Sequence, residues 1–402
     1  MGNVIELSTV ITDIAAGPFG SNLKVECFVP SGFPIIDGAN LKGFKVTDNV
    51  TKFVTEEKAR SLSRSIAHRG DVIVTISGTI GQIAYIPEDS LYDEYLCSQR
   101  QFRVSFDSSM VYVPYLVFYF HTFEGQNKIL SFANQTGVPA LSQPLKNFKK
   151  IRLCLPSLQE QRRIASIVET INDKIENNIK INDNLEQQAQ SYFQELFVDN
   201  ADPEWTTGTI SDLGAVVGGS TPSKAKPEYY TESGIAWITP KDLSINKSKF
   251  VSHGENDITE LGLKNSSAAI MPEGTVLFSS RAPIGYIAIA AGEVTTNQGF
   301  KSVVPKPEIG TPFVYFFLKN TLPVIEGMAS GSTFKEVSGS TMKNVPAVIP
   351  DAETLAKFSD FCAPIFAQQR ILEEQNQSLA TLRDNLLPKL MSGEIDVSAV
   401  QL

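Results

Sequence analysis

The second half of this chain repeats the first, and no other feature restricts the fold as much. The matching segments keep their order in both halves of the 402 residues: Ser31-Gly32 and Ser233-Gly234 at an offset of 202, Gly70-Asp71-Val72 and Gly274-Thr275-Val276 at 204, Ser77-Gly78 and Ser280-Arg281 close behind, Gly81 and Gly285 at 204, Thr136-Gly137 and Ser330-Gly331 at 194, and Leu155-Pro156 and Ile349-Pro350 at 194. An ordered repeat over most of the chain predicts two copies of one domain. The length agrees, because a domain usually holds about 150 residues.

Each copy is expected to mix helices with strands. The runs at 71–76 and 275–279 are short, rich in β-branched residues and preceded by glycine, as buried strands are. The segments 113–120 and 312–318 have helical spacing and a proline near the start. The glycine-containing segments that follow the two strands are expected to be turns.

A long helix is expected after each globular copy. Residues 157–198 contain no proline and no glycine, and their apolar residues recur at steps of three and four, as in a coiled-coil seam: Ile164, Val168, Ile171, Ile175, Leu185, Ala189, Tyr192 and Leu196. The second stripe falls within 351–387: Phe358, Phe361, Ile365, Leu372, Leu379, Leu382 and Leu386. Pro388 is expected to end or kink this helix, since proline lacks the amide donor, and Gly393 completes the stop.

The two long helices are expected to pair with each other. A helix of about 42 residues is about 60 Å long at 1.5 Å per residue, and its single apolar stripe needs a partner. The repeat favours an antiparallel coiled coil with pseudo-twofold symmetry. Asn178 and Asn182 fall on the first seam. They are either part of a solvated stretch or a polar device that selects the helix register.

The expected fold is of the mixed α/β (α+β) class, with two tandem globular domains separated by the two long helices. The expected boundaries follow the composition: 1–156 for the first domain, 157–199 for the central helix, 200–350 for the second domain, 351–393 for the distal helix and 394–402 for a C-terminal tail. The net charge of −9 is uneven, because residues 157–199 and 351–402 carry −4 each. The globular parts are nearly neutral, so either could present a basic face.

Several kinds of chemistry are missing from the sequence. There is no Gly-x-x-x-x-Gly-Lys-Ser/Thr loop and no Asn-Pro-Pro-Phe segment, which disfavours ATP hydrolysis and amino-methyl transfer by this chain. Gly17-Pro18-Phe19-Gly20 is interpreted as a plain turn rather than a phosphate cradle, since no helix start or basic residue follows it. The 3 histidines and 4 cysteines lack metal-ligand spacing. We therefore expect no catalytic residues, no metal site and no cofactor in this chain.

We also expect a cytoplasmic protein without a membrane partner. The sequence contains no run of 18 apolar residues, its first residues do not resemble a secretory signal, and its cysteines are widely separated.

The helix starts and ends resemble those of a known family. Leu155-Pro156-Ser157-Leu158-Gln159-Glu160-Gln161-Arg162-Arg163-Ile164 is similar to the start of the central helix in specificity subunits of type I restriction–modification systems. The segment 382–395, Leu-Arg-Asp-Asn-Leu-Leu-Pro-Lys-Leu-Met-Ser-Gly-Glu-Ile, is similar to the end of their distal helix. Gly17–Leu23 and Gly70–Gly81 resemble segments of their target-recognition domains, and Gly331–Phe334 is similar to the turn that precedes each long helix. The second helix start, Ile349–Thr354, lacks the family's Glu-Gln pair.

The resemblance implies a non-catalytic subunit that binds double-stranded DNA. Two target-recognition domains would each recognise one half of a split, asymmetric site, while the helices set the spacing and dock two methyltransferase (modification) subunits. S-adenosylmethionine, ATP and Mg²⁺ would be bound by partners, which include restriction/motor subunits. A spacer of about 60 Å predicts half-sites centred roughly one to one and a half DNA turns apart, at about 34 Å per turn.

Polar residues in the loops bracketed by the repeat are the candidate DNA contacts, since side chains at base edges specify sequence. Arginine is the strongest candidate because it can bond guanine bidentately, which favours Arg100 and Arg281. The full set is Asn40, Lys42, Ser77, Thr79, Gln99, Arg100 and Thr136 in the first domain, and Lys241, Asp242, Ser280, Arg281, Asn297, Gln298, Ser332 and Lys335 in the second.

Two other functions remain open at this point. The chain could be the recognition subunit of a stand-alone or type IIB-like modification system, which the neighbouring subunit genes would reveal. It could also be a coiled-coil scaffold that binds only protein. DNA binding that weakens steeply with salt would separate the scaffold from the other two.

Overall fold

The computed structural model describes residues 2–134, 137–331 and 335–400 and consists of two compact units. Unit 1 comprises Met1–Lys174 and Leu379–Leu402, and unit 2 comprises Ile175–Ser378. Each unit therefore holds one globular domain together with a part of each long helix.

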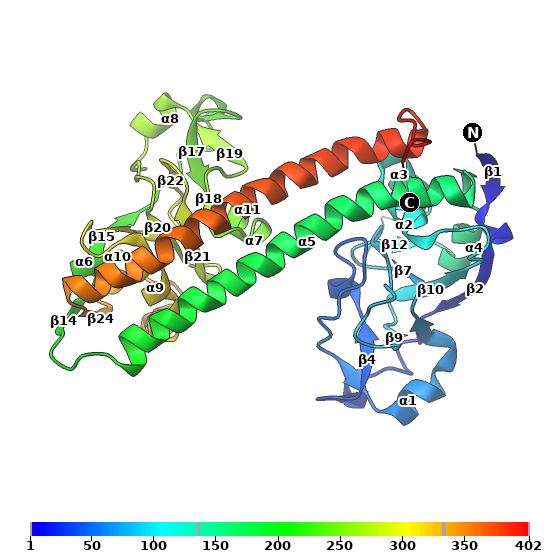
Figure 1. Ribbon diagram of the computed structural model, residues 1–402, viewed down its shortest axis with the longest axis horizontal. Coiled ribbons are helices and arrows are strands. Elements are labelled where there is room, and N and C mark those ends of the chain that lie inside the picture. Colours follow the sequence, from blue (N-terminus) through cyan, green and yellow to red (C-terminus); the bar gives the residue numbers. More distant parts are fainter. Residues whose placement is uncertain (1, 135–136, 332–334, 401–402) are drawn as a thin grey trace. The chain divides into compact units, whose positions relative to one another are not determined.

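The globular domain of unit 1 is built on two main sheets. One has the strand order β2 (Ile11–Ala16), β10 (Gln101–Phe106), β7 (Val72–Thr75), β8 (Ile83–Tyr85). The other has the order β3 (Phe28–Val29), β5 (Phe53–Val54), β4 (Phe33–Ile36), β9 (Glu94–Cys97), β6 (Ile66–His68). Figure 1 labels β2, β7 and β10 of the first sheet and β4 and β9 of the second. Two short pairs join β1 (Asn3–Glu6) to β13 (Arg152–Leu155) and β11 (Ala133–Asn134) to β12 (Ala140–Leu141). The helices are α1 (Glu56–Ser61), α2 (Val113–His121), α3 (Phe123–Leu130) and α4 (Pro144–Lys149).

The globular domain of unit 2 repeats this topology. Its sheets have the orders β15 (Gly214–Gly218), β23 (Lys301–Pro305), β20 (Val276–Ser280), β21 (Ile284–Ala290), β18 (Phe250–Val251) and β16 (Tyr230–Thr231), β19 (Asn256–Ile258), β17 (Ile235–Ile238), β22 (Thr295–Thr296), with β14 (Thr206–Thr209) paired to β24 (Pro346–Ile349). The helices are α6 (Ile210–Leu213), α7 (Pro240–Ile245), α8 (Glu260–Lys264), α9 (Thr311–Met328) and α10 (Gly339–Lys343). The predicted duplication and mixed fold class are confirmed.

The apolar helices of the two domains cover equivalent sheets. In unit 1, Phe118 and Phe120 of α2 share a core with Val74 of β7. In unit 2, Phe316 of α9 shares a core with Phe278 of β20. The predicted helix at 113–120 is confirmed, whereas α9 extends ten residues beyond the predicted 312–318 and passes through Pro323.

The long helices are α5 (Leu158–Gln194), followed by one turn of π-helix over Glu195–Asp199, and α11 (Ala352–Ser392). The residues of their predicted stripes are buried or partly buried, except that Phe361 and Leu382 of α11 are 39% and 47% exposed. In unit 1, Ile164 and Val168 of α5 share a core with Leu387 and Leu390 of α11. In unit 2, α5 and α11 share a second core, to which they contribute Ala189, Phe193, Leu355, Phe358 and Cys362.

Within unit 2 the two helices run antiparallel. Asn178 donates to Asn376 Oδ1 at 2.9 Å, whereas Asn182 donates to the Gln369 carbonyl at 3.4 Å, so rising numbers on α5 meet falling numbers on α11. Asn178 is fully buried, which makes the solvated interpretation of this position wrong. A buried amide left without its partner is costly, so this contact favours one register.

The sequence predicted that Pro388 would end or kink the helix, and it does not end α11. The helix continues to Ser392, and Gly393 closes it with φ +77°, as predicted for the stop. Pro388 lies in the last turns of the helix and removes one backbone hydrogen bond. The burial of Leu387 and Leu390 on either side of it offsets this loss.

A buried cluster of charges attaches the domain of unit 2 to both helices. The Lys249 ammonium, beside β18, donates to Glu186 Oε2 of α5 at 2.8 Å and to Gln369 Oε1 of α11 at 2.9 Å, and it lies 3.4 Å from the ring centroid of Phe366. Glu186 also accepts hydrogen bonds from Tyr315 and Lys319. Because lysine is rarely buried without a partner, this cluster holds the sheet in one place on the helices.

Candidate nucleic-acid interface

Unit 1 contains a polar cleft at the ends of its strands, here called cleft 1. Its volume is about 530 Å³, and three turns frame it: the turn after β7, the turn between β9 and β10, and the turn after β4. The polar side chains and turn residues that line it are Asp37, Lys52, Thr75, Ser77, Gly78, Thr79, Gln82, Ser98, Gln99, Arg100 and Gln101. A concave site of this size with convergent polar groups is the usual form of a recognition site.

Local hydrogen bonds set the shape of cleft 1. After β4, the Asp37 carboxylate accepts from the Ala39 amide at 2.9 Å while the Asn40 side chain accepts from the Asp37 amide at 3.0 Å, which forms a capping box. Gly17 packs against the turn between β9 and β10, because a Cβ on Gly17 would lie 1.9 Å from the Ser98 carbonyl oxygen. The chain therefore approaches the cleft wall as closely as a glycine allows.

Unit 2 contains an equivalent opening, here called cleft 2, with a volume of about 700 Å³. The turns after β17, β20 and β22 frame it, as their counterparts frame cleft 1. Its polar side chains and turn residues include Thr221, Lys224, Thr239, Lys241, Asp242, Glu255, Asn256, Arg281, Asn297, Gln298 and Gly299.

Cleft 2 has the same capping box and the same closely packed glycine, formed by different residues. Thr239 caps the short helix after β17, and Asp242 completes the capping box by accepting from the Thr239 amide at 2.7 Å. Gly219 takes the place of Gly17, since a Cβ there would lie 2.0 Å from the Asn297 carbonyl oxygen. The two clefts are therefore copies of one site.

Both clefts have a small excess of positive charge. Cleft 1 is lined by two cationic side chains and one carboxylate, and cleft 2 by three and two. Lys52 donates to Asp37 at 2.7 Å and, although burial opposes the shift, keeps the pKa of that carboxyl below its ordinary value. The exposed Arg100 guanidinium has no ion-pair partner among the residues that the structure describes. Such a side chain is free to contact an anion or a base edge.

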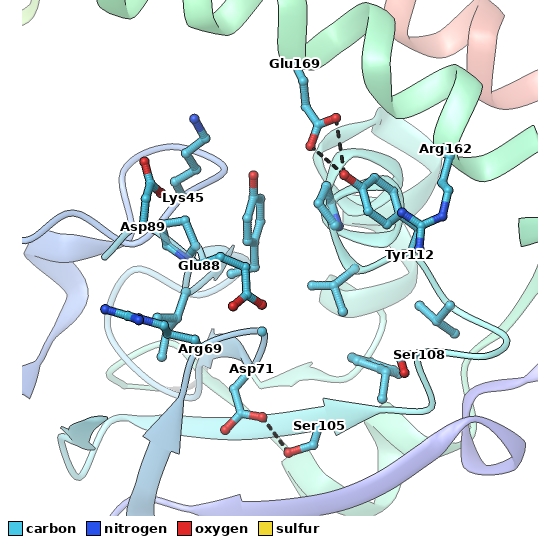
Figure 2. Close-up of a pocket in the computed structure, with 18 of the residues that line it drawn as sticks. Lys45, Arg69, Asp71, Glu88, Asp89, Ser105, Ser108, Tyr112, Arg162 and Glu169 are labelled. Atoms are coloured by element: carbon cyan, nitrogen blue, oxygen red, sulfur yellow. Dashed lines mark hydrogen bonds between the residues drawn. The ribbon is translucent and has the colours of Figure 1, made fainter. Parts of the chain in front are cut away.

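A third hollow, in unit 1, has the opposite balance of charge. Figure 2 shows Glu88, Asp89, Asp71 and Glu169 around it, with Tyr112 donating to Glu169 and Ser105 to Asp71. Its lining holds five carboxylates against three cationic side chains. This excess of negative charge does not suit a phosphate backbone, so clefts 1 and 2 are the candidate interface.

The sequence matches the profile of one protein family over residues 30–187 and 203–382, which covers most of both repeats. That profile is described as the type I restriction modification DNA specificity domain. This chain belongs to that family.

Curated relatives of this specificity-domain protein carry the same description. The type I restriction enzyme MjaIX specificity subunit of Methanocaldococcus jannaschii is 39% identical over 194 residues, which are 46% of this chain and 45% of that one. The HindI specificity subunit of Haemophilus influenzae is 22% identical over 392 residues, which cover 78% of this chain and 84% of that one. The match with the M. jannaschii subunit thus spans less than half of that relative.

A solved structure has the same fold as this specificity-domain chain. The S subunit of a type I restriction–modification system from M. genitalium aligns with a TM-score of 0.58 at 16% identity, over 97% of this chain and 96% of that one. Two tandem mixed domains with long helices are therefore the shared architecture.

The structure places the predicted DNA contacts of this specificity-domain chain in different surroundings. Eight of them line the clefts and are at least partly exposed: Ser77, Thr79, Gln99 and Arg100 in cleft 1, and Lys241, Arg281, Asn297 and Gln298 in cleft 2. Lys42 and Lys335 are exposed but do not line either cleft. Thr136 and Ser332 lie outside the described residues.

Three of the predicted contacts are buried and engaged in internal hydrogen bonds. Asn40 donates to the carbonyls of Thr47 and Asn49 at 3.0 and 3.2 Å in addition to its capping role. Asp242 belongs to the second capping box, and the Ser280 hydroxyl donates to the Gly299 carbonyl at 3.1 Å. These three side chains shape the clefts from within.

Further residues at the clefts were not among the DNA contacts predicted from the sequence. Lys52 and Lys224 line clefts 1 and 2, and Thr221 donates to Gln298. Phe19 is 81% exposed beside cleft 1, next to Gly20, whose Cβ would lie 2.8 Å from Gln99 Oε1. A local signal existed only for Phe19, since a large apolar side chain in a plain turn is unusual. Lys52 and Lys224 come from segments that reach the clefts by long-range folding.

Two further observations concern metal ligands and helix length in the described residues. No group of three or more histidine, cysteine, aspartate or glutamate residues that could hold a metal ion occurs in the described part of the chain. Within the same residues, no helix has the length and apolar character needed to cross a membrane.

Proposed function

We propose that this chain is the sequence-specific DNA-binding subunit of a type I restriction–modification complex, in which each domain recognises one half of a bipartite, asymmetric site. The main support is the occurrence of one cleft design in two domains, with polar side chains that differ between the copies. The family of the chain supports the same class of function. A protein that recognised two identical half-sites would need two clefts with the same lining. Cleft 1 instead presents Ser77, Thr79 and Arg100, and cleft 2 presents Lys241, Arg281 and Asn297.

In this proposal, the chain itself does not catalyse a reaction. Two methyltransferase subunits would bind S-adenosylmethionine and methylate the DNA, and restriction/motor subunits would use ATP and Mg²⁺. The type I restriction–modification setting of its relatives supports these partners. The role of this chain is to bind DNA, with cationic side chains contacting phosphates and polar groups at base edges selecting the sequence.

Methylation mapping tests this function directly. A host that expresses this chain with its cognate methyltransferase subunit should methylate one bipartite motif with two different half-sites, and omission of this chain should abolish that motif. An unmodified genome, together with no salt-dependent DNA binding by the assembled complex, would reject the proposal in favour of a protein scaffold.

Arg281→Ala is expected to weaken DNA binding and relax the second half-site. A bidentate arginine–guanine pair contributes about 1–3 kcal/mol of discrimination. The exposed Lys264 in α8 is the matched control, because Lys264→Ala removes the same charge from unit 2 but outside cleft 2. Titration of the complex with motif DNA and mismatched DNA measures both effects. If Arg281→Ala leaves affinity and half-site preference intact, Arg281 does not contact the bases.

We further propose that the long helices set the distance between the half-sites. An insertion of about seven residues after Lys174, with a matching insertion after Ser378, keeps the apolar seam in phase. It would lengthen each helix by about 10 Å, which corresponds to about three base pairs of DNA. The methylation map should then show the same half-sites with a wider spacer. An unchanged spacer would contradict this role of the helices.

A further inference from the structure

The strand register shows which residues are equivalent at the two clefts. In unit 1, Ile35 and Ile36 pair in parallel with Leu96 and Cys97. In unit 2, Trp237 and Ile238 pair in the same way with Thr295 and Thr296. The turn that follows is therefore Ser98-Gln99-Arg100 in cleft 1 and Asn297-Gln298-Gly299 in cleft 2. The position of Arg100 is held by a glycine in the second domain.

A second pair of backbone contacts gives the same alignment. The Ile76 amide donates to the Arg100 carbonyl at 2.6 Å, and the Ser280 amide donates to the Gly299 carbonyl at 2.7 Å. Ile76 and Ser280 are therefore equivalent, although the sequence repeat had matched Ser280 with Ser77.

The facing turn continues this alignment by one more residue. Ser77 corresponds to Arg281, and the residues that follow them, Gly78 and Ala282, both have left-handed backbones with φ of +90° and +50°. The next glycines, Gly81 and Gly285, agree as well, with φ of +91° and +94°. The turns thus have left-handed residues at the same two positions, although the Ala282–Pro283 peptide bond of the second turn is cis.

Each cleft consequently holds one arginine, but on opposite turns. Cleft 1 has Arg100 on the turn after β9 and a serine, Ser77, on the facing turn. Cleft 2 has Arg281 on the turn after β20 and Gly299 on the turn after β22. The glutamine, in contrast, occupies the same position in both clefts, because Gln99 and Gln298 are equivalent and both are exposed.

The surroundings of each arginine fit this exchange. Arg281 donates to Glu336 at 3.3 Å. The Leu141 amide donates to the Ile76 carbonyl, and the Val337 amide donates to the equivalent Ser280 carbonyl. Glu336, which precedes Val337, is therefore equivalent to Ala140 in the first domain. Arg100 instead extends toward the facing turn, where a Cβ on Gly78 would lie 3.6 Å from its Nη1. The two guanidiniums are therefore carried by different turns and have different neighbours.

We infer that the exchanged arginine is the guanine-selecting residue of each domain, and that the turn that carries it determines where the guanine lies within the half-site. This inference rests on the proposed function. Arginine is the usual partner of guanine O6 and N7 in the major groove. We expect an arginine on the other turn of the cleft to reach a different base pair or strand. The two half-sites should thus carry their selected guanines at non-equivalent positions.

The test transfers the arginine within unit 1 and leaves unit 2 unaltered. We compare the wild-type chain, Arg100→Ala, and the double variant Ser77→Arg/Arg100→Gly, each expressed with the methyltransferase partner, and map the methylated sites. Arg100→Ala should reduce the preference for one guanine in the first half-site at least tenfold. The double variant should lose that guanine and prefer a guanine at another position. The second half-site should persist in all three maps, which shows that every variant folds and assembles.

The possible failures are distinguishable. The inference is overturned if the wild-type first half-site contains no selected guanine, if Arg100→Ala leaves that half-site unchanged, or if the double variant loses the guanine without gaining another. In each case a bipartite motif would still be present, so the proposed function would stand. The absence of any bipartite motif in the wild-type map would instead reject the proposed function.

Discussion

Glu186→Gln is expected to destabilise unit 2 by about 3 kcal/mol, as measured by chemical unfolding, because removal of one partner from a buried ion pair leaves the other charge uncompensated. Lys249 is only 7% exposed, and Glu186 is the carboxylate closest to its ammonium group, at 2.8 Å. The change also removes a charged acceptor from Lys319 and Tyr315. The partial exposure of Glu186 places the expected effect at the lower end of the usual range.

Lys249→Met is the matched control for this variant. The methionine would keep the contact with the Phe366 ring while removing the buried cation, and Glu186 would retain Lys319 and Tyr315. Because Lys319 remains as an ion-pair partner of Glu186, the carboxylate stays compensated, and we expect a smaller loss than for Glu186→Gln, of about 1 kcal/mol. Equal destabilisation by the two variants would show that the loss arises from packing and not from the unpaired lysine.

The acid dependence of unfolding provides a second measurement on the same cluster. Although burial opposes it, the charges of Lys249 and Lys319 lower the pKa of Glu186 from the ordinary 4.5 to about 2. Burial lowers the pKa of Lys249 to about 8, so both groups are charged at neutral pH. Because the carboxyl pKa is depressed in the folded state, its stabilisation is complete above about pH 4.5 and is lost as the pH falls toward 2. Glu186→Gln should remove this part of the acid dependence.

Gly219→Ala is the second change with a large expected effect. Its new Cβ would lie 2.0 Å from the Asn297 carbonyl oxygen and 2.4 Å from that of Thr296, and both atoms belong to the backbone that precedes Gln298. Neither can move away as a flexible side chain would, so the turn must shift. We expect a loss of about 3 kcal/mol in the stability of unit 2, together with loss of the second half-site from the methylation map.

Gly292→Ala controls for the loss of glycine flexibility itself. No atom lies within 4 Å of a Cβ built at Gly292, so this variant should remain close to the wild type in stability and in both half-sites. If Gly219→Ala behaved in the same way as Gly292→Ala, the close approach of the chain at cleft 2 would not be needed for recognition.

The periodic features of the sequence predicted much of the fold. The ordered repeat predicted the doubled topology, and the apolar steps of three and four predicted α5 and α11, because a continuous stripe on a long helix must be covered. Pro388 does not end α11, although an end or a kink was predicted there. The rule for proline concerns local hydrogen bonds, whereas the helix end is decided by the burial of Leu390 in the core of unit 1.

The linings of the clefts could not be predicted in the same way. Asn40 and Gln99 are both polar residues in turns, yet Asn40 is buried in a capping box and Gln99 is exposed in cleft 1. Local sequence does not separate these roles, because the same side chains cap short helices and contact bases. The separation comes from strand pairing between segments far apart in the chain.

By itself, therefore, the sequence determined the duplication, the long helices, the lack of recognisable catalytic motifs and the family resemblance, since each depends on periodicity or on a contiguous motif. Only the tertiary structure decided that Arg100 and Arg281 lie on opposite turns of equivalent clefts. That assignment depends on the register of β9 against β4 and of β22 against β17, which is set by hydrogen bonds between strands about 60 residues apart. A repeat with offsets that drift from 202 to 204 to 194 cannot specify such a register residue by residue.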